Sequence, residues 1–175
     1  MYRFTTSFSY LVNKVGVRIG ELFSRDLAPY DVTVPMYRVL AALWEQGDQR
    51  LGELSAMTTV ELSTLSRLVS AMKRRGLVSR ARVQTDERSI RINLTAKGRA
   101  LAAELMAVAA RNEGVTVRAL GDDELTVLRR SLVTVFNNLD QLERESAGAA
   151  AKTTLHRRTS GSQAQRRGVR ESRSS

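Results

Sequence analysis

Small hydroxyl side chains surround one arginine in the middle of the sequence, on a helix that we expect from about Glu61 to Arg75. These polar residues are Ser63, Thr64, Ser66, Arg67 and Ser70. Small hydroxyl residues let a helix approach base edges in the major groove, and an arginine there can form bidentate contacts to guanine. The pattern predicts a surface that reads double-stranded DNA. The alternative for Arg67 is an ordinary solvated position, which is the usual place of a helical arginine.

Basic residues continue beyond this cluster. The segment from Arg67 to Arg91 has eight basic and two acidic residues, a local charge of +6. We expect phosphate or groove contacts from Lys73, Arg80, Arg82 and Arg88, with Asp86 in the same region. For three of them a role within the fold is the alternative: a cation such as Lys73 is favoured at any helix C-terminus, and Arg80 and Arg82 can protect a strand edge from aggregation.

The elements around these residues follow from the apolar periodicity. A short helix at about 51–57 and a turn at 58–60 precede the helix at 61–75, which Gly76 ends. From Leu77 the period changes to two, which predicts two strands joined by a polar tip at 84–87. Short helix, turn, longer helix and hairpin is the order of a winged helix-turn-helix.

Longer helices are expected on both sides of this unit. Apolar residues at steps of three and four predict a helix over 4–27 that ends before Pro29. Thr33 can cap the next helix, which runs to Gly47, and Thr95 can cap one that runs to about 120. A last helix starts at Asp122. The predicted fold class is mainly α-helical with a small β-hairpin wing.

Residues 51–98 resemble the MarR family of bacterial regulators. The resemblance rests on STLSRLV at 63–69, RRGLVSR at 74–80 and DERSIRINLT at 86–95, all in register, and it extends over about 1–145. It implies that Ser63, Thr64 and Arg67 face the major groove and that Arg88 enters the minor groove. Asp86 would orient the wing by pairing with an arginine. The chain has Glu87 where several members have a second basic residue. The glutamate weakens the positive electrostatic potential of the wing.

The resemblance also implies a domain organisation and a homodimer. Residues 1–32 and 96–145 would form a helical dimerisation region, and 33–95 the DNA-binding region. For residues 146–175 we expect a disordered basic tail, because that stretch has few large apolar side chains. The tail has a charge of +6 out of the net +10, so the overall basicity is weak support for DNA binding. Added phosphate attraction is a second possible role of the tail.

The junction between the two predicted regions often holds an aromatic acid or a similar effector in this family. By resemblance, candidates for a small aromatic or anionic effector are Arg18, Tyr37, Arg38 and Trp44. Core packing is the alternative for Trp44, and surface ion pairs are the alternative for the two arginines. The sequence names no ligand.

Other classes of function find little support in the sequence. It has no cysteine, and its single histidine, His156, lies in the predicted tail. Without a glycine-rich phosphate loop or metal-spaced acidic residues, we predict no catalytic, cofactor or metal site and no enzyme. No apolar run approaches the ~20 residues that cross a bilayer, so we expect a cytoplasmic protein on the bacterial nucleoid.

The function hypothesis is a sequence-specific transcriptional regulator. By resemblance it would be a ligand-responsive repressor that binds a pseudo-palindromic operator as a homodimer. One alternative is an architectural protein that binds DNA without sequence preference through its basic wing and tail. The other is a protein-interaction module whose winged helix no longer reads DNA.

Overall fold

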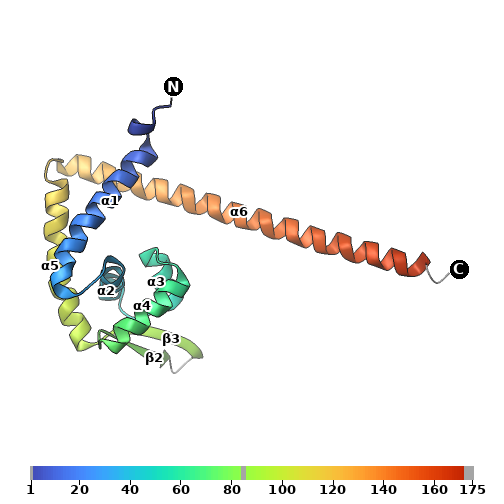
Figure 1. The fold of residues 1–175 in the computed structure, drawn as a ribbon, viewed down its shortest axis with the longest axis horizontal. Helices are drawn as coiled ribbons and strands as arrows, with labels where there is room; N and C mark the ends of the chain where they lie inside the picture. Colours follow the sequence, from blue (N-terminus) through green and yellow to red (C-terminus); the bar gives the residue numbers. More distant parts are fainter. Residues whose placement is uncertain (1, 84–85, 172–175) are drawn as a thin grey trace. The chain divides into compact units, whose positions relative to one another are not determined.

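The computed structural model describes residues 2–83 and 86–171. The chain divides into two compact units, Met1–Arg118 and Ala119–Ser175. The first unit contains helices α1 to α5 and a small sheet, and the second contains helix α6 (Figure 1). The predicted class, mainly α-helical with a small β-hairpin wing, is confirmed, and a third short strand joins the hairpin.

The N-terminal helical segment has two parts. A 3-10 turn, η1, spans Phe4–Thr6, and helix α1 spans Phe8–Leu27. Ser7 separates them because its backbone is extended and its hydroxyl oxygen accepts the N–H of Tyr10 at 3.4 Å. The single helix predicted over 4–27 is therefore interrupted by an N-cap. A second 3-10 turn, η2 at Ala28–Tyr30, follows α1.

Helix α2 spans Val34–Gln46 and has the predicted ends. The hydroxyl oxygen of Thr33 accepts the N–H of Met36 at 3.4 Å, and Gly47 ends the helix with a φ of +73°. Its inner face is formed by Met36, Val39, Leu40 and Leu43, which are buried. Trp44 is 38% exposed, so core packing, the alternative considered for it, is wrong.

Helices α3, Leu51–Thr58, and α4, Leu62–Arg74, form the helix-turn-helix. Thr59 makes the turn in the left-handed region with a φ of +54°, and the hydroxyl of Ser55 donates to the Val60 carbonyl at 2.7 Å. These contacts fix the angle at which α4 leaves α3.

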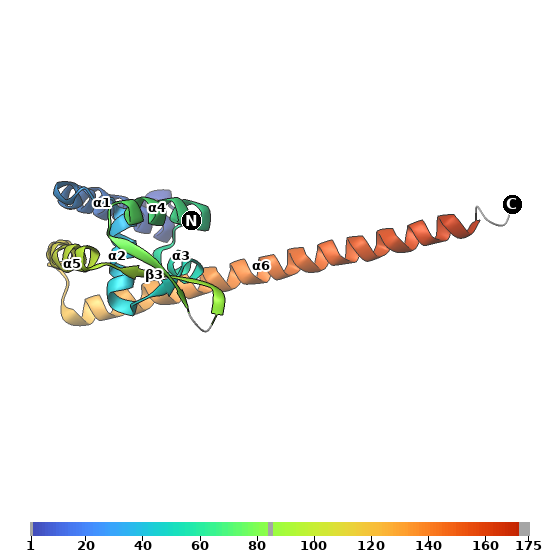
Figure 2. The same cartoon turned by 90° about the horizontal axis from the view of Figure 1, so that it is seen from below.

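Three strands make an antiparallel sheet in the order β1-β3-β2. They span Gln49–Arg50, Val78–Val83 and Asp86–Leu94 for β1, β2 and β3. The β2–β3 hairpin is the predicted wing, and it extends away from α5 in both views (Figures 1 and 2). Strand β1 is not predicted by the sequence, because two residues carry too little periodicity to be recognised.

Helix α5, Ala96–Val117, begins at a close contact with the sheet. Thr95 caps it by accepting the N–H of Gly98 at 3.0 Å, and the same hydroxyl donates to the Gly76 carbonyl at 2.6 Å. A Cβ on Gly98 would lie 1.9 Å from the carbonyl oxygen of Leu77. Glycine is therefore required where the start of α5 lies against Leu77, directly before β2. The helix ends three residues before the predicted 120.

The first unit is built around one apolar core. It includes buried residues of all five helices and of the sheet, among them Leu27, Leu40, Leu54, Leu65, Leu77, Ile92 and Leu105. Helix α5 packs against α1 and α2, which places the core between these helices and the helix-turn-helix (Figure 1). Core residues of the other elements therefore pack against the apolar face of α4 and fix the position of this helix.

Helix α6 spans Asp122–Glu171, with Asp122, Asp123 and Glu124 in its first turn, where acidic groups are favoured. The expected disorder of 146–175 differs from the structure, in which the backbone stays helical through Glu171. The stretch contains no proline and is rich in alanine and arginine, both good helix formers. Among the described residues, no helix is long and apolar enough to cross a membrane.

Candidate nucleic-acid interface

The outer side of α4 carries the hydroxyl and basic residues that the sequence pattern predicts for DNA contact. Ser63, Thr64, Arg67 and Lys73 are exposed, and Ser66 and Ser70 are half-buried. Leu65, Val69 and Met72 lie on the opposite side and are fully buried. Leu62 has the same apolar spacing as these residues but is 50% exposed, in the first turn of the helix. We call Ser63, Thr64, Ser66, Arg67 and Ser70 the reading face.

Glu61 caps α4 and contacts the first two residues of the reading face. Its carboxylate accepts the backbone N–H of Ser63 at 2.9 Å and that of Thr64 at 3.1 Å. The hydroxyls of Ser63 and Thr64 also donate to this carboxylate. The hydrogen bond from the Ser63 hydroxyl is the main cause that lowers the pKa of Glu61 to about 2, with the two N–H bonds adding to it. Glu61 therefore stays ionised at neutral pH.

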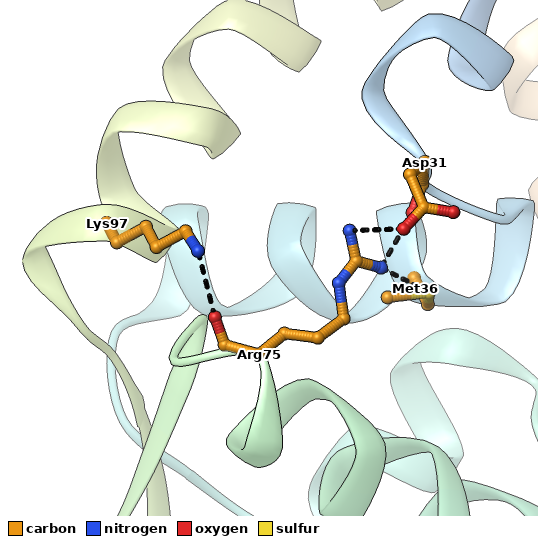
Figure 3. Close-up of polar contacts among 4 residues, drawn as sticks. All are labelled: Asp31, Met36, Arg75 and Lys97. Atoms are coloured by element: carbon orange, nitrogen blue, oxygen red, sulfur yellow. Dashed lines mark hydrogen bonds and ion pairs between the residues drawn. The ribbon is translucent and has the colours of Figure 1, made fainter.

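The opposite end of α4 is fixed to the rest of the unit by a clamp of four residues, Asp31, Met36, Arg75 and Lys97 (Figure 3). The Arg75 guanidinium donates to the Asp31 carbonyl at 2.6 Å, pairs with the Asp31 carboxylate at 3.1 Å and contacts the Met36 sulfur at 3.6 Å. Lys97 donates to the Arg75 carbonyl at 3.1 Å. The clamp joins α4 to the loop before α2 and to the start of α5.

Asp31 holds its part of the clamp in a left-handed backbone conformation, with a φ of +53°. Aspartate is one of the few residues other than glycine that adopt this conformation at low cost. Arg75 therefore serves to position α4, whereas its neighbours Lys73 and Arg74 are exposed. The sequence pattern does not predict that Asp31 pairs with Arg75, because the two residues are 44 positions apart.

The wing contacts the reading face through Arg80 on β2. Its guanidinium donates to the Ser70 hydroxyl at 3.1 Å, and that hydroxyl donates to the Ser66 carbonyl at 2.8 Å. Arg80 therefore connects the wing with α4 and is exposed toward solvent. Arg91 on β3 pairs with Asp48 at 3.5 Å and donates to its carbonyl at 3.1 Å, which fixes the base of the wing.

The outer part of the wing carries the remaining predicted residues. The backbones of Arg82, Asp86 and Arg88 lie on β2 and β3, with Arg82 opposite Ile90 and Val83 opposite Asp86. The register shifts between Arg82 and Val83, which is a bulge-like irregularity. The side chains of Arg82, Asp86 and Arg88 lie outside the described residues, and their roles stay predictions.

Two neighbouring cavities share Ile19, Phe23 and Tyr37, the larger between α1, α2 and α5 and the smaller between α1 and α2. The larger has a volume of about 330 Å³ and is lined by Ile19, Phe23, Tyr37, Ala109, Asn112, Glu113, Thr116 and Val117. The smaller, of about 250 Å³, is lined by Gly16, Ile19, Gly20, Phe23, Val34, Tyr37 and Arg38. The Tyr37 ring packs edge-on against Phe23, with 4.6 Å between centroids. Burial, followed by the charges of Glu45 and Glu113, raises the pKa of Tyr37 above its usual value.

Two of the four effector candidates line these cavities. Tyr37 lines both, and Arg38 lines the smaller one while it donates to the Thr58 carbonyl and the Thr59 hydroxyl, each at 3.3 Å. Arg18 pairs with Glu21 at 2.8 Å on the surface of α1. Arg18 and Trp44 are absent from the described linings of both cavities.

Comparisons with known proteins identify the family. Residues 21–105 match the family model described as transcriptional regulator SarA/Rot. The chain is 30% identical over 133 residues to the HTH-type transcriptional repressor IacR of Pseudomonas putida, which covers 76% of this chain and 80% of that protein. The solved complex of a MarR mutant from E. coli with operator DNA has a TM-score of 0.69 at 23% identity, over 77% of this chain and 99% of that one. The chain belongs to the MarR family.

Two further proteins show a similar extent of similarity. The regulator TtmR of Methylorubrum extorquens is 31% identical over 136 residues, which are 78% of this chain and 65% of that protein. The structure of BpsR from Bordetella bronchiseptica has a TM-score of 0.71 at 24% identity, over 77% of this chain and 96% of that one. The present protein is a DNA-binding transcriptional regulator with a winged helix-turn-helix fold.

Three features of this MarR-family chain do not follow from the sequence pattern as we interpreted it. The sequence pattern indicated Glu61 only as the start of a helix and did not predict its hydrogen bonds with the Ser63 and Thr64 hydroxyls. An acidic N-cap residue shortly before two hydroxyl residues is a signal that could have indicated them. The clamp has no local signal. Asn112, which donates to Asp26 at 2.9 Å, and Glu113 line the larger cavity from α5, where nothing in the sequence distinguishes them from surface residues.

Proposed function

We propose that this regulator binds a pseudo-palindromic operator as a homodimer, with α4 in the major groove and the wing in the flanking minor groove. The observation that carries the proposal is the reading face, which presents Ser63, Thr64 and Arg67 on a helix that is fixed at both ends. A rigid helix with small polar residues and one arginine suits contact with base edges. The proposed activity is binding without catalysis, and its place is the bacterial chromosome.

Exposed apolar surfaces support the homodimer. On α1 they comprise Phe8, Leu11, Val12, Val15, Ile19 and Leu22, and on α6 they comprise Leu128, Leu132, Phe136, Leu139 and Leu142. Apolar stripes of this length are unfavourable in water and mark interaction surfaces. We assign dimerisation to 1–32 and 96–145, as the family resemblance implies. Twofold symmetry then places the two recognition helices about 34 Å apart, one turn of DNA.

A small effector would bind at the cavities around Tyr37. The larger cavity is within the range of volumes that small molecules occupy, about 300–1,000 Å³. DNA binding by BpsR is regulated by 6-hydroxynicotinic acid, and IacR is a repressor. By analogy we propose an aromatic ligand whose ring packs against Phe23 and Tyr37. An anionic group on it would face Arg38 rather than Glu113.

The test compares full-length wild type, Arg67→Ala and Arg111→Ala on DNA from upstream of the protein's own gene. Arg111 is an exposed arginine on α5, so its variant makes the same charge change away from the reading face. Loss of a base contact costs about 1–3 kcal/mol, so Arg67→Ala should bind roughly 5- to 150-fold more weakly to this DNA but not to scrambled DNA. Equal losses for both variants would contradict the proposal.

The charge of the tail supports a second candidate, an architectural protein without sequence preference. The stretch 146–175 supplies +6 of the net +10 charge. A full-length variant with its seven tail lysine and arginine residues changed to glutamine separates the two. A site-specific regulator keeps its discrimination between upstream and scrambled DNA, whereas an architectural binder loses most of its affinity.

A further inference from the structure

The hydroxyls of Ser63 and Thr64, the first two of the reading face, both donate hydrogen bonds to the Glu61 carboxylate. Ser63 donates its hydroxyl proton to Glu61, and Thr64 does so at 3.4 Å. Glu61 is exposed and ionised, so it accepts hydrogen bonds and donates none. Its two backbone hydrogen bonds to α4 keep the carboxylate in place beside both hydroxyls.

This arrangement fixes what the hydroxyls can offer to DNA. A serine or threonine hydroxyl has one proton and two lone pairs, so a hydroxyl that donates to Glu61 presents only lone pairs outward. In the major groove, cytosine N4 and adenine N6 are donors, whereas guanine O6 and N7 and thymine O4 are acceptors. An outward lone pair pairs with the first group and repels the second.

We propose that Glu61 makes Ser63 and Thr64 hydrogen-bond acceptors, so that the first turn of α4 selects cytosine or adenine at the base positions these two residues contact. Glu61 is thereby a positioning residue for specificity that acts through its neighbours. Arg67, one turn further along, offers only donors and selects guanine. The inference rests on the proposed placement of α4 in the major groove.

The experiment is selection from a randomised pool of double-stranded DNA with the full-length protein. Ser63→Ala and Thr64→Val first identify the positions that each hydroxyl reads, because enrichment there disappears in the corresponding variant. At these positions the wild type should favour cytosine or adenine over guanine or thymine by roughly tenfold, the usual cost of one mismatched base pair.

Glu61→Gln then tests the cause. With its amide oxygen on the Ser63 N–H, where Oε1 lies in the wild type, its NH₂ group replaces the oxygen that accepts both hydroxyls, so a proton becomes available for guanine or thymine. The preference should fall to within about threefold in this variant. Glu53→Gln is the matched control, since Glu53 is an exposed acid that accepts the Arg50 N–H at the start of α3 and touches no hydroxyl of the reading face. It should keep the wild-type preference.

The outcomes separate the inference from the function on which it rests. A wild type that enriches no sequence overturns the proposed function. A wild type that enriches guanine or thymine at the Ser63 and Thr64 positions overturns the inference alone, and so does a Glu61→Gln variant with unchanged preferences. The thermal transition of Glu61→Gln shows whether this variant folds. If it does not fold, the bases that the wild type enriches at the mapped positions still test the inference.

Discussion

The clamp at the C-terminal end of α4 gives a prediction about stability that can be worked out from its contacts. We expect Arg75→Gln to destabilise the first unit, because it removes the hydrogen bond to the Asp31 carbonyl, the ion pair and the sulfur contact. The Arg75 side chain is 32% exposed, but its hydrogen bond to the carbonyl lies at an exposed position. A hydrogen bond from a charged group contributes about 1.5–3 kcal/mol, reduced here by partial exposure.

The ion pair between Arg75 and Asp31 contributes less to the free energy of unfolding than this hydrogen bond does. The side chain of Asp31 is 94% exposed, and exposed pairs contribute about 0–1 kcal/mol. Arg75→Gln should therefore lower the free energy of unfolding by about 1–2 kcal/mol, and Asp31→Asn by less than about 0.5 kcal/mol. Asparagine tolerates the left-handed backbone, so Asp31→Asn tests the ion pair without adding strain.

The assay is urea unfolding followed by circular dichroism at one protein concentration, because the stability of a dimer depends on concentration. Arg74→Gln is the matched control, since Arg74 is the exposed neighbour with the same charge. Its effect should stay within about 0.5 kcal/mol, as is usual for surface changes. Equal effects of Arg74→Gln and Arg75→Gln, or a larger effect of Asp31→Asn than of Arg75→Gln, would refute the reasoning about the clamp.

Three further predictions concern the packing of α5, the cap of α4 and the exposed stripe of α6. Gly98→Ala should destabilise the protein by about 1–3 kcal/mol in the same assay, because the new Cβ would meet the Leu77 carbonyl at 1.9 Å; a neutral result would contradict this close approach. The pKa of Glu61 is lowered to about 2 in the folded protein, so the stability that its ionised form contributes is present above its usual value of 4.5 and is lost as the pH falls toward 2. The stability difference between wild type and Glu61→Gln should therefore shrink between about pH 5 and pH 2, and a constant difference would argue against the cap. Leu132→Glu combined with Phe136→Glu should convert a dimer to a monomer in sedimentation, with Arg130→Glu, an exposed position with the same total charge change, as the charge control; a dimer that persists would remove α6 from the interface.

Local signals predicted much of the fold. Thr33, Gly47 and Thr95 act at the helix ends expected for them, because capping depends on a side chain and backbone groups within about four residues. The change of apolar period at Leu77 located the wing for the same reason. Such features need only the neighbouring sequence, and the structure confirms these boundaries.

Features that depend on distant residues were not predicted. Strand β1 exists because Gln49 pairs with Ile92, which lies 43 positions later, and two residues alone carry no strand pattern. The clamp and the bond between Asp26 and Asn112 likewise join distant segments. Trp44 directly follows the buried Leu43 near the end of α2, yet its own side chain is 38% exposed, which local sequence does not reveal.

The site was predicted at the level of elements rather than of its polar network. Exposure of Ser63, Thr64 and Arg67 followed from the stripe of Leu65, Val69 and Met72 on the other side of the helix. The hydrogen bonds among these residues did not follow, because hydroxyl partners depend on backbone geometry at the helix start. The sequence pattern therefore indicated Glu61 only as the start of a helix.

The central claim is tested most directly by the affinity of the full-length protein for its own upstream DNA and for scrambled DNA of equal length, measured across a salt series. A site-specific regulator should prefer the upstream DNA by a thousandfold or more at one salt concentration, the lower end of the usual range of about 10³–10⁷. Equal affinity for both DNAs, falling steeply with salt, would contradict the account and leave a non-specific basic binder.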